Sequence, residues 1–173
     1  MKNKQPGQSS VYTPEKEIPS YYKPNAFPIV DHVNPEEFYL IYSAFPKIAK
    51  YDMLGNKLWE RKIPESTEMD SVSSQFYRIS NQLRGKSRVE LKKYVAGVSD
   101  TEGNFYLALG KYYNDKPSFS LWIHKFDKKG TLITRYKLIS KRVNLSAIFD
   151  IDSDGNRIFV ITGRGEIRAY SLD

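Results

Sequence analysis

One pattern of short strands and tight turns occurs three times along the chain, and its clearest copy covers residues 147–172. Residues 147–152 alternate between apolar and polar side chains, as expected for a strand with one buried face. The Asp-Gly-Asn sequence at 154–156 is a tight-turn signal, because glycine and asparagine adopt positive φ at little steric cost. Residues 158–162 form a continuous apolar run, which predicts a strand covered on both faces.

The same pattern recurs upstream with similar residues at matching positions. The turn that begins at Asp100 aligns with the turn that begins at Asp152, and the strand Phe105–Ala108 aligns with Ile158–Ile161. Phe38–Ile41 is the third copy of this strand. An alternating strand follows each copy, and the first two copies continue through an Asp-x-x-Gly turn into a fourth strand. Four antiparallel strands per repeat are typical of a β-propeller blade.

The repeats predict an all-β fold of three four-stranded antiparallel blades, equal to half of a six-bladed propeller, with one helical insert. The expected propeller domain is 25–173, with blades at 25–64, 95–139 and 144–173 and an insert at 65–94. The third copy ends after its third strand, so residues 1–24 are either a polar tail or linker, or a closing strand. Known propellers have ~4–8 blades. We therefore expect either the C-terminal half of a six-bladed protein or two copies that pair into a six-bladed ring.

The repeated motifs resemble those of a known family. Asp-x-[Asp/Glu]-Gly-Asn before an apolar strand, followed by Ile-x-x-[Phe/Tyr]-Asp-x-x-Gly, resembles the NHL/TolB-type six-bladed propellers, especially those abundant in Bacteroidetes. The resemblance covers about residues 26–173 and concerns turns and core strands, so it implies a fold and only weakly a function. Such proteins are usually exported, which implies an extracytoplasmic location. Residues 1–10 are polar and lack the apolar segment of a signal peptide, so the location stays open.

The composition limits the class of protein. The 173 residues include no cysteine, so neither disulfides nor thiolate metal sites are available. The sequence contains no run of ~18 apolar residues, so it predicts no membrane-spanning helix. The net charge of +7 is compatible with an anionic partner. The lysines and arginines are spread over all three repeats, however, which favours solvated outer strands over a nucleic-acid-binding surface.

The insert between the first two repeats has the pattern of an amphipathic helix. Asp70 is the N-cap candidate, and the helix is predicted to end near Gly85. Its apolar residues follow one another at intervals of three or four positions: Val72, Phe76, Ile79 and Leu83. We expect this side of the helix to pack on the propeller rather than to bind a partner.

Two inserts make one face of the predicted propeller more elaborate than the other. The turns between strands two and three of a blade lie on the same face as the crossovers to the next blade. Both the insert at 65–94 and a second insert at 110–118 belong to this face. Binding residues concentrate in loops carried by a rigid scaffold, so we expect a ligand here. The residues expected near it are Phe45, Lys47, Tyr94, Lys111, Tyr112, Tyr113, Asn114 and Arg164.

Few residues have the pattern of a catalytic or metal site. Asp150–Asp154 imitates the first half of a calcium loop, but Ile161 stands where such a loop needs its bidentate glutamate. The two histidines, His32 and His124, have no second ligand at metal-binding spacing. We therefore predict no catalytic residue, no metal site and no cofactor.

Three functional hypotheses follow from the sequence. We favour a non-enzymatic binding or scaffold module that takes a glycan or a peptide on the elaborated face. The first alternative is a propeller-type hydrolase or lyase whose catalytic residues lie partly in other blades. The second is nucleic-acid binding through the basic surface. We do not expect it, because basic and aromatic residues alternate in the outer strands of any blade.

Overall fold

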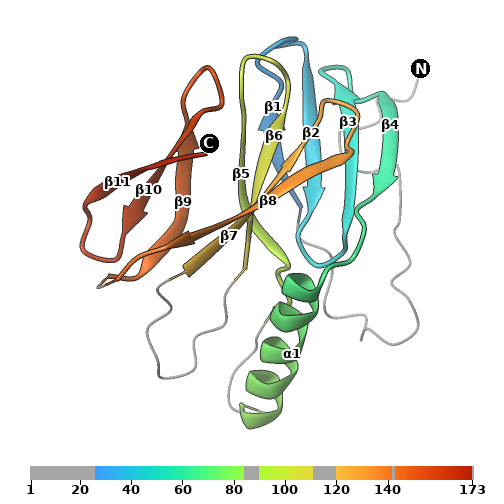
Figure 1. Cartoon of the computed structure of the whole chain (residues 1–173). Helices are drawn as coiled ribbons and strands as arrows, with labels where there is room; N and C mark the ends of the chain where they lie inside the picture. Colours follow the sequence, from blue (N-terminus) through green and yellow to red (C-terminus); the bar gives the residue numbers. More distant parts are fainter. Residues whose placement is uncertain (1–25, 84–89, 111–119, 142, 173) are drawn as a thin grey trace.

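Three antiparallel β-sheets stand side by side as the blades of a partial propeller (Figure 1). The computed structural model describes residues 26–83, 90–110, 120–141 and 143–172. The predicted all-β fold with one helix is confirmed. The expected closing strand within residues 1–24 lies outside the described residues.

The strand order in each blade follows the chain, and each strand pairs antiparallel with its neighbour in sequence. Blade one contains β1 (Ala26–Val30), β2 (Glu37–Tyr42), β3 (Lys47–Asp52) and β4 (Lys57–Lys62). Blade two contains β5 (Tyr94–Ser99), β6 (Phe105–Leu109), β7 (Ser120–Phe126) and β8 (Leu132–Ile139). Blade three has three strands within the described residues: β9 (Leu145–Ile151), β10 (Arg157–Thr162) and β11 (Ile167–Ser171).

The position of a strand within its blade explains its sequence pattern. All five residues of β6 are buried, because this strand has a neighbouring strand on each side and a neighbouring blade on each face. β8 is the outermost strand of blade two, and its burial alternates along most of its length. The continuous apolar runs and the alternating runs of the sequence therefore mark inner and outer strands respectively.

The repeated aspartates close the turns between strands. Asp100 Oδ1 accepts hydrogen bonds from the backbone N–H groups of Glu102 at 3.0 Å and Asn104 at 2.9 Å. Asp52 and Asp127 do the same in the β3–β4 and β7–β8 turns. Such bonds satisfy backbone donors that a tight turn leaves without a strand partner. The acidic residues of the repeat therefore have a structural role in the turns.

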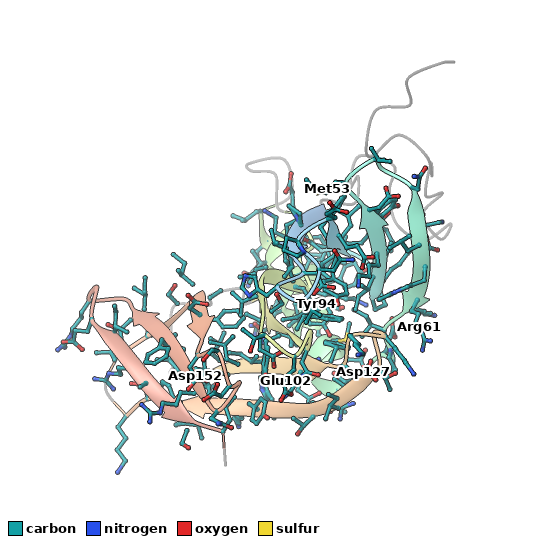
Figure 2. All side chains as sticks on the ribbon, turned by 90° about the horizontal axis from the view of Figure 1, so that it is seen from above. Met53, Arg61, Tyr94, Glu102, Asp127 and Asp152 are labelled. Atoms are coloured by element: carbon teal, nitrogen blue, oxygen red, sulfur yellow. The ribbon has the colours of Figure 1, made fainter. Side chains whose placement is uncertain are left out.

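The blades pack against one another through two apolar cores. We call the side of a blade that faces the next blade in chain order its forward face, and the opposite side its rear face. The forward face of blade one and the rear face of blade two share one core, whose members include Ile29, Tyr39, Ile41, Phe105, Leu107 and Phe126. The forward face of blade two and the rear face of blade three share the other, whose members include Tyr106, Ile123, Phe149, Ile158 and Val160. Seen from above, the blades form an arc, with Met53 on blade one, Glu102 on blade two and Asp152 on blade three (Figure 2).

A tyrosine hydroxyl crosses each of the two interfaces. The Tyr39 hydroxyl of blade one lies 3.2 Å from Asp31 Oδ2 and 3.3 Å from the Gly103 carbonyl oxygen of blade two. The Tyr106 hydroxyl of blade two repeats this arrangement, 3.1 Å from Asp100 Oδ2 and 3.5 Å from the carbonyl oxygen of Gly155 in blade three. We call this arrangement the tyrosine–glycine contact. It joins neighbouring blades at the same repeat position.

A lysine supports each of these tyrosines. Lys50 Nζ lies 5.1 Å from the centroid of the Tyr39 ring and forms ion pairs with Asp31 at 2.7 Å and Glu37 at 2.6 Å. Burial opposes the ionisation of Asp31, but hydrogen bonds from Lys50 and from the backbone outweigh it and lower the pKa of Asp31. In blade two, Lys125 Nζ lies 5.2 Å from the centroid of the Tyr106 ring.

The insert forms one helix, α1 (Thr67–Gln82), which projects from one end of the sheets (Figure 1). Its N-cap is Ser66 rather than the predicted Asp70, because the Ser66 hydroxyl accepts a hydrogen bond from the Met69 backbone N–H at 3.4 Å. Asp70 instead lies in the first turn, where the helix dipole favours an acidic side chain. Met69 and Val72 pack into the core between blades one and two. Within the described residues, no helix has the length and apolar character needed to cross a membrane.

Candidate ligand-binding cleft

Four of the eight residues expected near a ligand lie in the described part of the chain. Phe45 is 4% exposed and belongs to a cluster on the rear face of blade one. Lys47 forms an ion pair with Glu60 at 2.8 Å. Tyr94 is buried, whereas Arg164 is exposed in the β10–β11 turn. The structure therefore does not bring these four side chains together at one surface. The other four, Lys111, Tyr112, Tyr113 and Asn114, lie outside the described residues.

Tyr94 is a core residue, which corrects the expectation that it contacts a ligand at the surface. Its hydroxyl lies 2.8 Å from His124 Nδ1 and 3.7 Å from the sulfur of Met69. Met69 belongs to the first turn of α1, so the insert that was expected to elaborate the face covers Tyr94 instead. The expectation that Phe45 contacts a ligand is corrected as well, because its side chain is buried among Tyr42, Ala49 and Tyr51.

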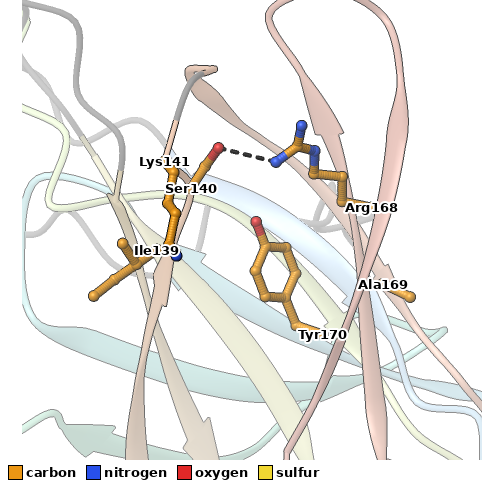
Figure 3. A pocket seen from close by; sticks show the side chains of 6 residues that line it. All are labelled: Ile139, Ser140, Lys141, Arg168, Ala169 and Tyr170. Carbon is orange, nitrogen blue, oxygen red and sulfur yellow. Dashed lines mark hydrogen bonds between the residues drawn. The ribbon is translucent and has the colours of Figure 1, made fainter.

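A cleft of about 480 Å³ lies between the outer strands of blades two and three (Figure 3). Its residues come from the end of β8 and the start of the crossover, and from β11: Ile139, Ser140, Lys141, Arg168, Ala169 and Tyr170. Figure 1 places the β8–β9 crossover at the same end of the sheets as α1. The cleft therefore opens beside the face that the sequence predicted to be elaborated.

Arg168 reaches across the cleft from blade three to blade two. One of its guanidinium nitrogens donates a hydrogen bond to the Ser140 hydroxyl at 3.1 Å, as drawn in Figure 3. Another lies 3.6 Å from the Glu166 carboxylate, and both of these side chains are more than a third exposed. The Ser140 hydroxyl also accepts a hydrogen bond from the Val143 backbone N–H at 3.3 Å. The serine is thus held from both sides, and it fixes the direction of the guanidinium.

Lys141 and Tyr170 give the cleft a second positive charge and an aromatic surface. Lys141 is exposed, and it forms no ion pair with the described residues. Tyr170 is half-buried and packs against the core between blades two and three. Figure 3 shows its ring between the two strands, close to the Arg168–Ser140 bond. Two cations, one phenol and two small side chains make a surface suited to a ligand that carries a carboxylate.

Little in the sequence points to this cleft. Arg168 and Tyr170 alternate in a strand whose pattern is that of any outer strand, and Ser140 and Lys141 lie in an ordinary crossover. The residues meet only because two blades stand side by side. Within the described residues no strand pairs with the outer edge of β11, whereas β8 pairs with the outer edge of β7 in blade two.

His124 and Tyr94 form a second cluster, buried beneath α1. His124 is 1% exposed, and its Nε2 has no hydrogen-bond partner among the described residues. Burial lowers the pKa of His124 to about 4, and the positive charge of Arg135 acts in the same direction. Burial likewise raises the pKa of the Tyr94 hydroxyl. Both side chains are therefore neutral near pH 7, and neither reaches the surface cleft.

The described residues contain no group of three or more His, Cys, Asp or Glu side chains placed to hold a metal ion. Asp152, from the turn that imitates a calcium loop, accepts hydrogen bonds from the backbone N–H groups of Asn156 at 2.7 Å and Arg157 at 3.0 Å. Its carboxylate thus serves the turn, as in the other repeats.

Comparison with known proteins gives distant structural similarity only. No protein-family model matches the chain, and no curated protein matches it. The chain is similar to the crystal structure of a putative 6-phosphogluconolactonase from Bacteroides fragilis NCTC 9343, with a TM-score of 0.45 and 13% identity over 88% of this chain and 35% of that one.

Two further solved structures are similar to the chain. One is a protein of unknown function from Bacteroides caccae, with a TM-score of 0.38 and 11% identity over 84% of this chain and 45% of that one. The other is a calcium-binding protein, regucalcin, from Agrobacterium tumefaciens strain C58, with a TM-score of 0.40 and 16% identity over 87% of this chain and 39% of that one. The chain thus spans less than half the length of each of these three structures.

Proposed function

We propose that this chain is a non-enzymatic binding module whose cleft between blades two and three takes an acidic glycan or an acidic peptide. The observation that carries the proposal is the convergence of Arg168, Lys141 and Tyr170 on one cleft of about 480 Å³. A scaffold of packed blades holds these side chains, as is common for binding residues.

The chemistry of the cleft favours a carboxylate with an apolar or sugar body attached. A guanidinium has five N–H donors, and Ser140 occupies one of them. A ligand carboxylate would displace the weak 3.6 Å contact with Glu166 and accept a bidentate pair from Arg168. The amphipathic ring of Tyr170 would then contact the attached body. Arg164 precedes β11 in the same blade and is exposed, so we include it as an outer contact, together with Lys111–Asn114.

The wider proposal concerns the unit to which the cleft belongs. Residues 25–173 act as one propeller unit of the NHL/TolB type, and residues 1–24 act as a tail or a closing strand. Further blades complete the ring, supplied by a second copy of the chain or by another segment. The three sheets, arranged as an arc with an apolar core at each interface, support this proposal.

Titration of the chain with two panels tests the ligand class. The panels are oligosaccharides that contain uronic acid and peptides rich in glutamate, each paired with its neutral counterpart. We expect binding by acidic members only, and a loss of about 10-fold to 100-fold in affinity for Arg168→Gln. Tyr170→Ala should also weaken binding, because the aromatic contact is lost. Isothermal titration calorimetry at two salt concentrations measures both effects.

Arg157→Gln is the matched control, because Arg157 is an exposed arginine at the start of β10 and does not line the cleft. Equal losses for Arg168→Gln and Arg157→Gln would indicate unspecific attraction to a basic surface and would contradict the proposal. Binding of the neutral panels with unchanged affinity would contradict it as well.

No observation on the described residues favours the alternatives over a binding module. A propeller-type hydrolase or lyase needs an accessible nucleophile or base, and the His124–Tyr94 pair is buried. Nucleic-acid binding would give an affinity that falls steeply with salt, because each neutralised phosphate releases counterions. The same titrations, repeated with single-stranded DNA and RNA, measure that slope.

A further inference from the structure

The rear face of blade one carries an open apolar groove of about 490 Å³. Its lining includes Pro28, Val30, Phe38, Leu40 and Met53. Val30 is 55% exposed and Met53 is 64% exposed, so the groove opens to the outside of the arc. At its base the Phe38 ring stacks on the Tyr51 ring, with their centroids 5.6 Å apart.

Blade two has the same groove positions on its rear face, and there blade one occupies them. Phe105 and Phe126 stand at the repeat positions of Phe38 and Tyr51, and they stack with their centroids 5.2 Å apart. The Tyr39 ring of blade one lies 4.6 Å from Phe105, and Ile29 of blade one packs directly on Gly97. The groove of blade one therefore has the shape and chemistry of a site that receives an aromatic side chain from the forward face of another blade.

The forward face of blade three is open and carries such an aromatic side chain. Phe159 stands at the repeat position of Tyr39 and Tyr106, and it is half-buried. Its partners on the neighbouring strands are Ala169 and the exposed Asp150, while Ile148 (64% exposed) and Ile167 (71% exposed) lie farther along the same face. This face would meet the rear face of a following blade. The two ends of the arc thus present the two complementary halves of one blade–blade interface.

The tyrosine–glycine contact shows that these two ends match each other rather than a standard blade. Phe159 lacks the hydroxyl that Tyr39 and Tyr106 place 3.3 Å and 3.5 Å from a glycine carbonyl oxygen of the next blade. In the turn of blade one, Glu36 stands at the position of Gly103, and its carbonyl oxygen already accepts a hydrogen bond from the Met53 backbone N–H at 2.8 Å. This turn, whose Pro35 lines the groove, therefore needs no hydroxyl from the blade that it faces. A standard glycine turn opposite Phe159 would leave its buried carbonyl group without a donor, which is unfavourable.

We propose that the forward face of blade three docks into the blade-one groove of a second copy of this chain, with Phe159 packed on Phe38 of that copy. The contact is heterologous, and two such contacts related by a twofold axis close a ring of six blades. This inference rests on the proposal that further blades complete the arc. It does not depend on the cleft between blades two and three, so its failure and the failure of ligand binding are separate results.

Light scattering coupled to size exclusion tests the docking, with one variant for each half of the contact. Wild type should have twice the mass of the 20.1 kDa chain. Phe159→Lys on blade three and Val30→Lys on blade one should each weaken the dimer at least about 100-fold, because each places an unpaired charge in both contacts. Ile148→Lys repeats the blade-three test at a side chain that is already 64% exposed. Ile133→Lys is the control, because Ile133 on β8 is 52% exposed and lies on neither open face.

Mixing the two variants gives the sharper result. In a heterodimer of Phe159→Lys with Val30→Lys, both substitutions fall in the same contact and the other contact is wild type. The mixture should therefore recover dimer that neither variant forms alone. A wild-type monomer, a dimer insensitive to both variants, or a mixture without recovery would each overturn the proposal. Circular dichroism of every variant shows whether the monomer has kept its fold, and Ile148→Lys decides the case if Phe159→Lys has not.

Discussion

The interior interfaces and the open ends of the arc use the same repeat positions but different chemistry. Inside the arc, the hydroxyls of Tyr39 and Tyr106 each lie between an aspartate of their own blade and a glycine carbonyl of the next blade. A lysine lies over each ring, Lys50 or Lys125. At the free end of blade three the corresponding residues are Phe159 and Ala169, so both the hydroxyl and the lysine are absent there, and the exposed Asp150 stands opposite Phe159 where Val98 stands opposite Tyr106.

The difference separates two properties of a blade interface, its stability and its selectivity for a partner. Burial of apolar surface supplies most of the stability of any such contact. The tyrosine–glycine contact adds a directional bond that is costly when either partner is missing, and so it fixes which turn meets which strand. The open end of blade three has no such hydroxyl and therefore buries no unsatisfied polar group at this position. Its selectivity for a partner then depends on shape and on the burial of apolar surface.

Removal of an aromatic ring from an interior interface should have the largest effect. Phe105 is fully buried between Tyr39 and Phe126, so Phe105→Ala should lower the free energy of unfolding by about 3–5 kcal/mol. Ile133→Ala, at a side chain that is 52% exposed, should change it by less than about 0.5 kcal/mol. Urea unfolding followed by circular dichroism compares the two. Similar losses would mean that the interior interface is not the main source of stability.

Acidification should weaken the interface between blades one and two through His124. The pKa of His124 is lowered to about 4 from 6.5, so the unfolded chain binds a proton in this range before the folded chain does. Stability from the neutral histidine is complete above about pH 6.5 and is lost as the pH falls toward 4, by up to about 3 kcal/mol. His124→Gln should remove this part of the pH dependence. Denaturant midpoints at several pH values measure it, and parallel curves for both proteins would refute it.

Two glycines with similar backbone angles distinguish the tyrosine–glycine contact from a simple turn. Gly155 has φ +69°, and a Cβ there would lie 2.7 Å from the Tyr106 hydroxyl. Gly165 has φ +80°, with nothing within 4 Å of its Cβ position. Gly165→Ala should cost about 1 kcal/mol from backbone strain, and Gly155→Ala should cost at least about 1 kcal/mol more. Thermal melts of the two variants give the difference, and equal costs would show that the close approach adds nothing.

The smallest effects are expected at the hydroxyl groups themselves. Tyr39→Phe and Tyr106→Phe should each cost about 1 kcal/mol, because each removes a hydroxyl that contacts both a buried aspartate of its own blade and a glycine carbonyl of the next blade. Phe159→Tyr introduces the same hydroxyl at the end of the arc and should bring no gain in stability. Chemical unfolding of the three variants tests the asymmetry. Stabilisation by Phe159→Tyr would mean that a standard acceptor turn faces blade three.

The strands and turns could be predicted from the sequence because each repeat carries its own local signals. Alternating and continuous apolar runs mark outer and inner strands, and an aspartate with a glycine marks each turn. The helix boundary was less certain, because Ser66 and Asp70 both have the side-chain chemistry of an N-cap. In the structure Ser66 is the N-cap, because its hydroxyl accepts a hydrogen bond from the Met69 backbone N–H.

The candidate site could not be predicted, because it depends on which side chains two blades bring together. Tyr94 beside basic residues has the pattern of a surface contact, and only the packing of α1 shows that it is buried. Arg168 and Ser140 are far apart in sequence and meet across the cleft. The tyrosine–glycine contact had a usable signal, since Tyr39 and Tyr106 occupy one repeat position and Phe159 departs from it.

Site-specific cross-linking tests the pairing of the two open ends most directly, because the chain has no cysteine of its own. Chains with Phe38→Cys and chains with Phe159→Cys are mixed and treated with a short thiol-reactive cross-linker. We expect a covalent dimer in the mixture and none in either chain alone, since Phe159 of one copy faces Phe38 of the other. Cross-linking within a single variant, or none in the mixture under conditions where the chain is dimeric, would contradict head-to-tail pairing of the blades.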